Sequence, residues 1–187
     1  VDAVNINDLL EEMVALSSQR TKYSMVRIRT DFSQNLPSLK VSISELQQVF
    51  FNLINNALDA MSGTGGRIDI ATTSDNETVS VEISDSGPGI PKSDMDRIFE
   101  PFFTSKEVER GTGLGLAIAH AIVEDHGGWI AVESKSNVGT SFLVYLPLQT
   151  APDSEDASAA EIKHSAIEGA EILLAEDNDL VRAMMAT

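Results

Sequence analysis

Apolar residues recur three and four positions apart between residues 46 and 61, the spacing of a helix that buries one face. These apolar positions are Leu46, Val49, Phe50, Leu53, Ile54, Ala57 and Met61. A second face of the same helix is polar and carries Glu45, Gln48, Asn52, Asn56 and Asp59. Two overlapping patterns, Ser42 to Glu45 and Ser44 to Gln47, fit capping boxes that start this helix, and the glycine-rich segment 63–66 ends it.

Helical periodicity also covers residues 5–20 and 114–125. Strand-like alternation is found at residues 25–30, 67–73, 78–84, 129–134 and 140–146, with a short strand at 39–41. The turn-forming residues 74–77 join the second and third of these strands, and the last two strands form another predicted hairpin. Residues 87–111 have no regular pattern. Helices interspersed with adjacent antiparallel strands predict an α+β fold with two layers.

The pattern divides the 187 residues into a domain at 1–148, a linker at 149–169 and a remnant at 170–187. The linker is rich in Ala, Ser, Asp and Glu and has few apolar residues. A short apolar strand follows and ends in the acidic pair Glu176 and Asp177, whose carboxylates suit Mg²⁺ in a complete domain. The remnant is too short to bury a core of its own.

Composition narrows the possible functions. The formal net charge of −16 argues against a nucleic-acid surface, which needs clustered Lys and Arg. A polyanionic ligand would therefore need a metal ion, helix N-termini and backbone amides. The sequence has no cysteine, no apolar run long enough to span a bilayer and no signal-peptide pattern. We expect a cytoplasmic location for this stretch, within a parent protein that can have a membrane segment elsewhere.

A carboxylate followed by two glycines stands directly after the strand at 78–84. In the segment from Asp85 to Pro91 the glycines bracket a proline, so the backbone can approach a planar ligand closely. The Asp85 carboxylate is a pure acceptor, which suits an adenine amine and does not suit phosphate. Taken alone, an ordinary Asp-Ser-Gly turn explains this motif better.

A second glycine motif, from Gly111 to Leu116, opens the helix at 114–125. Glycines there expose backbone N–H groups at a positive helix end, where oxyanions bind. No Gly-Lys-Ser/Thr follows, so this is not a Walker loop, and Leu116 stands where the Rossmann motif has its third glycine. A flexible turn is the alternative. Likewise the carboxamides of Asn52 and Asn56 suit a hard divalent cation, or form a solvated polar face.

The order of the motifs is more specific than any one of them. The Asn-rich helix is followed by Asp85-x-Gly-x-Gly, the Phe- and Pro-containing segment 99–106, Gly-x-Gly-x-Gly, and finally residues 139–142, Gly-Thr-Ser-Phe. In this order residues 1–148 resemble the ATP-binding catalytic domain of sensor histidine kinases, within the gyrase, heat-shock chaperone and MutL superfamily. The segment 56–60, Asn-Ala-Leu-Asp-Ala, is most similar to nitrogen-regulation kinases and many hybrid kinases. The resemblance implies a mixed, mostly antiparallel sheet covered on one face by helices.

The resemblance also implies roles for individual residues in binding Mg·ATP. Asn56 is expected to ligate Mg²⁺ through the nucleotide phosphates, supported by Asn52. Asp85 is expected to accept the adenine amine, in a pocket shaped by Gly87, Gly89, Ile90 and Thr140. The phosphate side comprises Gly111, Thr112, Gly113, Leu114, Gly115 and Leu116. Lys106 and Arg110 either reach phosphate or belong to the solvated surface. Residues 92–110 are expected to form a lid over the nucleotide. Phe99, Phe102 and Phe103 are expected to anchor this lid or to contact the phosphoacceptor domain.

Two residues depart from the related proteins. Hydrolytic members of the superfamily carry Glu where this chain has Asn52, and a carboxamide cannot act as a base for water. Many histidine kinases carry Lys near phosphate where this chain has Asp59, so its phosphate contacts differ in detail. The site therefore favours transfer of phosphate over hydrolysis, although an autonomous ATPase and a non-catalytic nucleotide-sensing module remain alternatives.

The resemblance implies partners that lie outside this chain. The phosphoacceptor His belongs to a dimerising helical hairpin, to which residues 1–20 are a possible link, and His120, His126 and His164 have no such context. No catalytic residue is therefore assigned within the chain. The remnant at 170–187 resembles the start of a receiver domain, so a receiver or response regulator is a second expected partner. We expect this chain to be monomeric and the parent protein to be a homodimer.

Overall fold

A five-stranded sheet forms one layer of the computed structural model, which describes residues 2–104 and 112–148 apart from the side chains of residues 2 and 18–24. The strands lie in the order β2 (Val26–Phe32), β4 (Gly66–Ser74), β5 (Thr78–Asp85), β7 (Gly139–Pro147) and β6 (Trp129–Lys135). The β2–β4 pair is parallel, and the other three pairs are antiparallel. The mixed, mostly antiparallel sheet and both hairpins are therefore confirmed.

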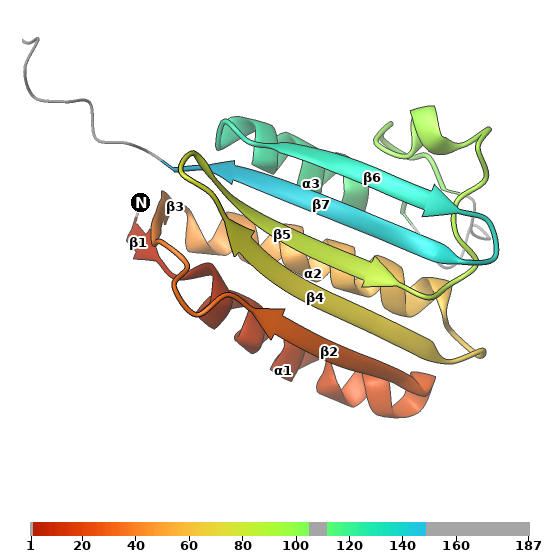
Figure 1. Cartoon of the computed structure of the whole chain (residues 1–187). Helices are drawn as coiled ribbons and strands as arrows, with labels where there is room; N and C mark the ends of the chain where they lie inside the picture. Colours follow the sequence, from red (N-terminus) through yellow and green to blue (C-terminus); the bar gives the residue numbers. More distant parts are fainter. Residues whose placement is uncertain (1, 105–111, 149–187) are drawn as a thin grey trace, which may run out of the picture. The chain divides into compact units, whose positions relative to one another are not determined.

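Helices α1 (Ile6–Ser24), α2 (Ile43–Ala60) and α3 (Gly115–Asp125) cover one face of this sheet (Figure 1). Strand alternation decides which face they cover. On β5, Val79, Val81 and Ile83 are buried, while Ser80 and Glu82 point to the other face. The two-layer prediction is confirmed, and residues at odd positions of β5, including Asp85, face the helices.

Helix α2 lies at the centre of the core, as its apolar spacing predicts. Its buried residues are Leu46, Val49, Phe50, Leu53, Ile54, Ala57 and Leu58. The largest of them, Phe50, has no exposed surface. Because burying a large apolar side chain contributes about 1.5–3 kcal/mol, this stripe holds α2 firmly against the sheet and keeps its Asn-bearing face in a fixed orientation.

The predicted capping boxes of α2 are wrong. Ser42 is the N-cap residue, but its side chain makes no capping hydrogen bond. Its backbone N–H instead donates to Nε2 of His126 over 3.2 Å, and the Glu45 carboxylate lies 3.6 Å from the same nitrogen. His126 follows α3 directly. A residue at the end of another helix therefore accepts the Ser42 N–H, which the Glu45 side chain of a capping box was expected to accept.

A two-stranded sheet lies beside the main one. It pairs β1 (Asp2–Val4), which the pattern did not predict, with β3 (Leu39–Val41) in antiparallel register. Helix α1 also extends beyond residue 20. The 3-10 turn η1 (Met95–Arg97) is the short helical element inside the irregular segment. In the described residues no helix is long and apolar enough to cross a membrane. The predicted linker and receiver remnant lie outside the described residues.

Candidate functional site

Asp85 ends β5 on the helix-covered side of the sheet, directly opposite Thr140 of β7. Its Oδ1 accepts the backbone N–H of Gly87 over 2.8 Å. Burial raises the pKa of the Asp85 carboxyl above its ordinary value, and the backbone N–H groups of Gly87 and Thr140 counteract part of this rise. The result is an acceptor held in a fixed orientation, with a partly desolvated oxygen suited to a ligand N–H.

The loop after Asp85 is locked against the turn between β6 and β7. Asn137 of that turn donates its backbone N–H to the carbonyl of Pro88 over 2.7 Å. Gly89 has φ +71°, and a Cβ there would collide with the backbone carbonyl of Lys135. Gly139 has φ +144°, and a Cβ there would collide with the carbonyl of Asp85. The sequence predicted that Gly87 and Gly89 let the backbone approach a planar ligand, whereas the close approach seen at Gly89 is between two segments of backbone.

Ser134 is a functional candidate that sequence reasoning missed. Its Oγ accepts the backbone N–H of Ile90 over 2.7 Å, and lies 3.1 Å from the carbonyl oxygen of Gly139 and 2.9 Å from Oγ1 of Thr140. The single hydroxyl thus joins the Asp85 loop to β7. No local pattern marks a serine on a strand as special, and its partners lie up to 44 residues away.

Asn52 fixes the start of α3 against α2. Its Nδ2 donates to the carbonyl oxygen of Gly115 over 3.0 Å, and a Cβ at Gly115 would lie 3.6 Å from its carboxamide carbon. Gly113 has φ +67°, and its carbonyl accepts the N–H of Phe102 over 2.9 Å. A Cβ at Gly113 would collide with the backbone of Phe102. The structure therefore brings the Asn-bearing helix and the start of α3 together.

Asn56 and Asp59 lie one and two turns beyond Asn52 on α2, and both are half-buried. In residues 2–104 and 112–148, no group of three or more His, Asp or Glu side chains is arranged to hold a metal ion. A single carboxamide suits a Mg²⁺ ion that keeps most of its water and binds phosphate oxygens. Thr112, Leu114 and Leu116 flank the start of α3, whereas Lys106, Arg110 and Gly111 lie outside the described residues.

The first half of the predicted lid packs on α3. Ile98 is buried, and the Phe99 ring lies 4.7 Å from the His120 ring. Arg97 lies over the Phe103 ring, 4.5 Å from its centroid. Phe102 has a left-handed φ of +67° and is 74% exposed. Phe99 and Phe103 are partly buried against the hydrophobic core and anchor this segment, whereas the Phe102 side chain is exposed.

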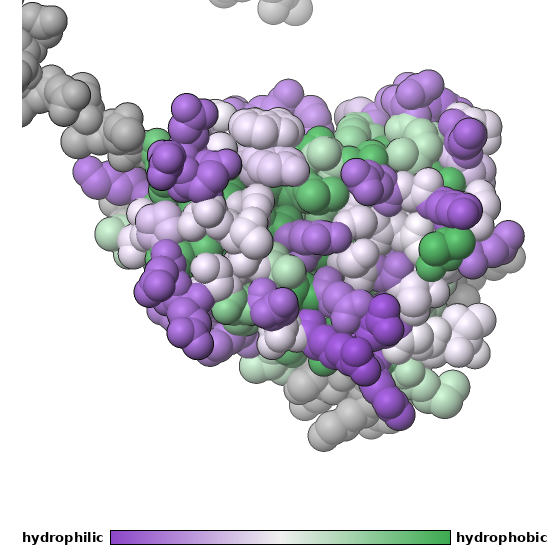
Figure 2. Space-filling view, viewed as in Figure 1, coloured by the Kyte–Doolittle hydropathy of each residue, from purple (hydrophilic) through white to green (hydrophobic). Residues whose placement is uncertain are grey.

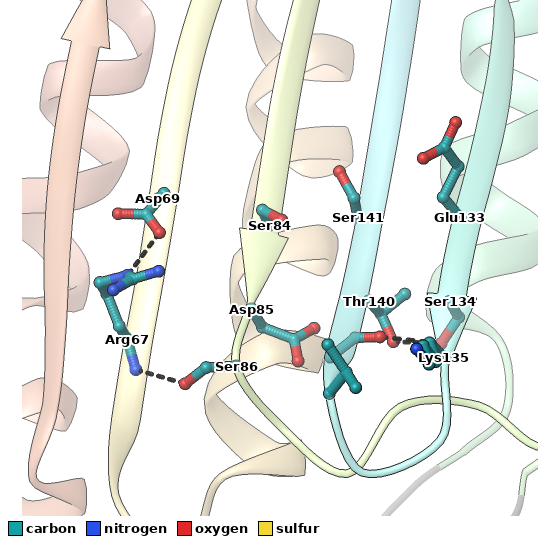
Figure 3. Close-up of a pocket in the computed structure, with 12 residues that line it drawn as sticks. Arg67, Asp69, Ser84, Asp85, Ser86, Glu133, Ser134, Lys135, Thr140 and Ser141 are labelled. Carbon is teal, nitrogen blue, oxygen red and sulfur yellow. Dashed lines mark hydrogen bonds and ion pairs between the residues drawn. The ribbon is translucent and has the colours of Figure 1, made fainter.

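A cavity of about 470 Å³ lies at the same ends of the strands (Figure 3). Asp85 and Thr140 line it, but most of its lining belongs to the uncovered face of the sheet, for example Arg67, Asp69 and Ser84. Figure 2, which has the same viewpoint as Figure 1, shows hydrophilic side chains over much of the uncovered face of the sheet. The cavity includes neither Asn52 nor Asn56, so it overlaps the predicted nucleotide site only at its Asp85 end.

An acceptor at a strand end, an Asn-bearing helix and a glycine-opened helix define a class of ATP-binding domain. Residues 42–150 match the family of histidine kinase-, DNA gyrase B- and HSP90-like ATPases, and the chain belongs to this family. Within it, the chain is a catalytic domain of the sensor histidine kinase type.

Similarity to named proteins supports this assignment. The chain is 37% identical over 148 residues to sensor histidine kinase ZraS of Escherichia coli, covering 79% of this chain and 31% of ZraS. It is 32% identical over 203 residues to sensor kinase CckA of Brucella abortus, covering 97% of this chain and 21% of CckA. The chain thus spans about a third or less of the length of these relatives.

Solved structures give the same result. The catalytic domain of histidine kinase ThkA aligns with a TM-score of 0.70 and 32% identity, covering 78% of this chain and 96% of that one. Full-length ShkA in complex with AMPPNP aligns with a TM-score of 0.70 and 28% identity, covering 80% of this chain and 31% of ShkA. The fold class is therefore shown by both the topology and the comparison.

Proposed function

We propose that this chain binds Mg·ATP and positions the γ-phosphate for transfer to a histidine on a separate dimerising hairpin. The observation that carries the proposal is the Asn52–Gly115 hydrogen bond, because it holds the Asn-bearing face of α2 beside the N-terminus of α3. A phosphate chain at that helix end would meet backbone N–H groups and a positive dipole. Catalysis would then come from positioning and charge stabilisation.

The adenine end is assigned to Asp85. Its carboxylate accepts the exocyclic amine, while Gly87, Gly89 and Ile90 shape the loop and Thr140 stands opposite. Gly87 lacks a side chain where one would contact the Asp85 carboxylate and Ala60 of α2. A larger residue at this position would therefore crowd the Asp85 carboxylate.

The phosphate end is assigned to Asn56 and the segment 111–116. Asn56 would hold Mg²⁺ here, and the ion would supply charge neutralisation of the phosphates. Gly111, Gly113 and Gly115, together with Thr112 and the amides of Leu114 and Leu116, form the proposed cradle. Lys106 is a proposed phosphate contact. Asp59 is proposed to lie near the phosphates, but its negative charge prevents it from binding them directly.

Transfer is favoured over hydrolysis because the position next to the metal ligand holds Asn52. Its carboxamide already donates to Gly115, and it has no basic group to take a proton from water. Appreciable steady-state ATP hydrolysis by the isolated chain would contradict this and would revive an autonomous ATPase.

Calorimetric titration with a non-hydrolysable ATP analogue tests the proposal directly. We expect Mg²⁺-dependent binding to the wild type and weaker binding to Asn56→Ala, with unchanged circular dichroism. Addition of a purified cognate hairpin and ATP should then produce phosphohistidine. Binding without phosphohistidine would favour a non-catalytic nucleotide-sensing module, and absence of binding to the folded wild type would refute the nucleotide site.

We further propose that residues 1–148 form this domain in a hybrid kinase of the nitrogen-regulation-like class, with a linker at 149–169 and the start of a receiver at 170–187. The similarity to CckA covers 97% of the chain, which is more than the catalytic domain alone. Glu176 and Asp177 would bind Mg²⁺ in the complete receiver. Phosphoaspartate formation in the parent protein tests this. Sedimentation should find this chain monomeric and the parent a homodimer.

A further inference from the structure

The end of the sheet next to Asp85 carries one row of polar side chains. Asp85 of β5 stands opposite Thr140 of β7, and Thr140 stands opposite Ser134 of β6. Figure 3 shows Thr140 between Asp85 and Ser134. Thr140 is 6% exposed, so few arrangements are open to its hydroxyl group. The row therefore places a buried hydroxyl on the strand next to the acceptor proposed to bind the base.

The positions of the protons in this row follow from counting donors. The Ile90 N–H can only donate to Ser134, and the Gly139 carbonyl can only accept from it. Ser134 has a single proton. Ser134 can therefore make all three contacts as hydrogen bonds in one way only. It donates to the Gly139 carbonyl and accepts from both the Ile90 N–H and the Thr140 hydroxyl. Thr140 thereby uses its only proton.

We propose that Ser134 is a positioning residue that makes Thr140 an acceptor-only group and so contributes to the purine selectivity of the site. This inference rests on the proposed binding of a nucleotide near Asp85. Thr140 and the Asp85 carboxylate then offer two neighbouring acceptors. The 6-amino group of a purine presents N–H donors to such a pair, whereas a 6-oxo group places an acceptor oxygen against two acceptors.

Replacing Ser134 by alanine would release the Thr140 hydroxyl, which could then rotate and donate to a carbonyl. The expected effect is a change of selectivity. If Ser134 only held the Ile90 loop in place, removing its hydroxyl would weaken the binding of both nucleotides by the same factor. The ratio of the two affinities therefore separates a positioning role from a merely structural one.

The experiment is calorimetric titration of the full chain with a non-hydrolysable ATP analogue and with its 6-oxo counterpart. In the wild type the 6-amino nucleotide should bind more tightly, and Ser134→Ala should reduce that preference about 2- to 10-fold, the value of one net hydrogen bond. Thr140→Val should reduce it similarly, and the double variant no further. Thr140→Ser, which keeps the hydroxyl, should keep the preference.

Ser80→Ala is the matched control, because its hydroxyl contacts Thr73 across two strands at 2.7 Å, away from the site. It should leave both affinities unchanged. An unchanged affinity ratio in Ser134→Ala, checked as folded by circular dichroism, would overturn the inference even if the nucleotide site is real. Absence of binding to the wild type would instead refute the proposed function on which it rests.

Discussion

Replacing Asp85 by asparagine separates nucleotide binding from stability. The carbonyl oxygen of the introduced carboxamide can keep the bond that Gly87 donates over 2.8 Å, so the loop should retain its shape. The other carboxylate oxygen becomes an NH₂ group, which faces the adenine amine donor to donor. Asp85→Asn therefore removes one ligand hydrogen bond to a charged acceptor, and the backbone N–H groups of Gly87 and Thr140 then face a neutral carboxamide.

The expected loss is about 1.5–3 kcal/mol of binding free energy, the usual value of a hydrogen bond to a charged group. This corresponds to about 10- to 150-fold weaker binding of an ATP analogue. Calorimetric titration measures it. Asp69→Asn is the matched control, because Asp69 lines the same cavity on the uncovered face and pairs with Arg67. Unchanged affinity in Asp85→Asn would refute the adenine assignment.

The stability of this variant should move in the opposite direction. Because burial raises the pKa of Asp85, the folded chain holds this proton more tightly than the unfolded chain does. Stability therefore falls as pH rises from the ordinary carboxyl pKa to the raised one, and the deficit persists at neutral pH. Asparagine carries no charge, so urea denaturation at pH 7 should find Asp85→Asn at least as stable as the wild type. A clearly less stable variant would show that the carboxylate supports the fold.

Three further variants test the packing around the site by urea denaturation. Asn52→Ala removes the bond to Gly115 and should cost about 0.5–1.5 kcal/mol and weaken nucleotide binding; unchanged binding would separate Asn52 from the site. Gly139→Ala places a methyl group against the carbonyl of Asp85 and should cost about 1–3 kcal/mol or more, so a wild-type midpoint would contradict the close approach. Phe50→Ala should cost about 3–5 kcal/mol because the ring is fully buried, and a loss below about 1 kcal/mol would refute its central position.

Local periodicity predicted α2 and both hairpins correctly, because burial repeats every 3.6 residues on a helix and every second residue on a strand. The order of the motifs also identified the family, since each motif is a short continuous segment. The glycine positions could be singled out for the same reason, because a left-handed φ or a close approach requires glycine at that one residue, as at Gly89 and Gly113.

Other features were decided by contacts between residues far apart in the chain. The three-residue strand β1 exists because β3 lies beside it, and so short a segment has no periodicity of its own. The backbone N–H of the N-cap residue Ser42 donates to His126, 84 residues away, so a local capping pattern was misleading there. Ser134 became a candidate only through its partners, and the bond from Asn52 to Gly115, 63 residues away, was likewise not predictable from local sequence.

The amino-acid sequence by itself determined the helices, the hairpins, the chemical types gathered at the site and the family. Only the tertiary structure decided the strand order, the parallel β2–β4 pair and the hydrogen-bond partner of each polar side chain. The physical reason is that periodicity and turn chemistry act over a few neighbouring residues. A hydroxyl or carboxamide, by contrast, acquires its role from whichever distant backbone group folding brings within about 3 Å of it.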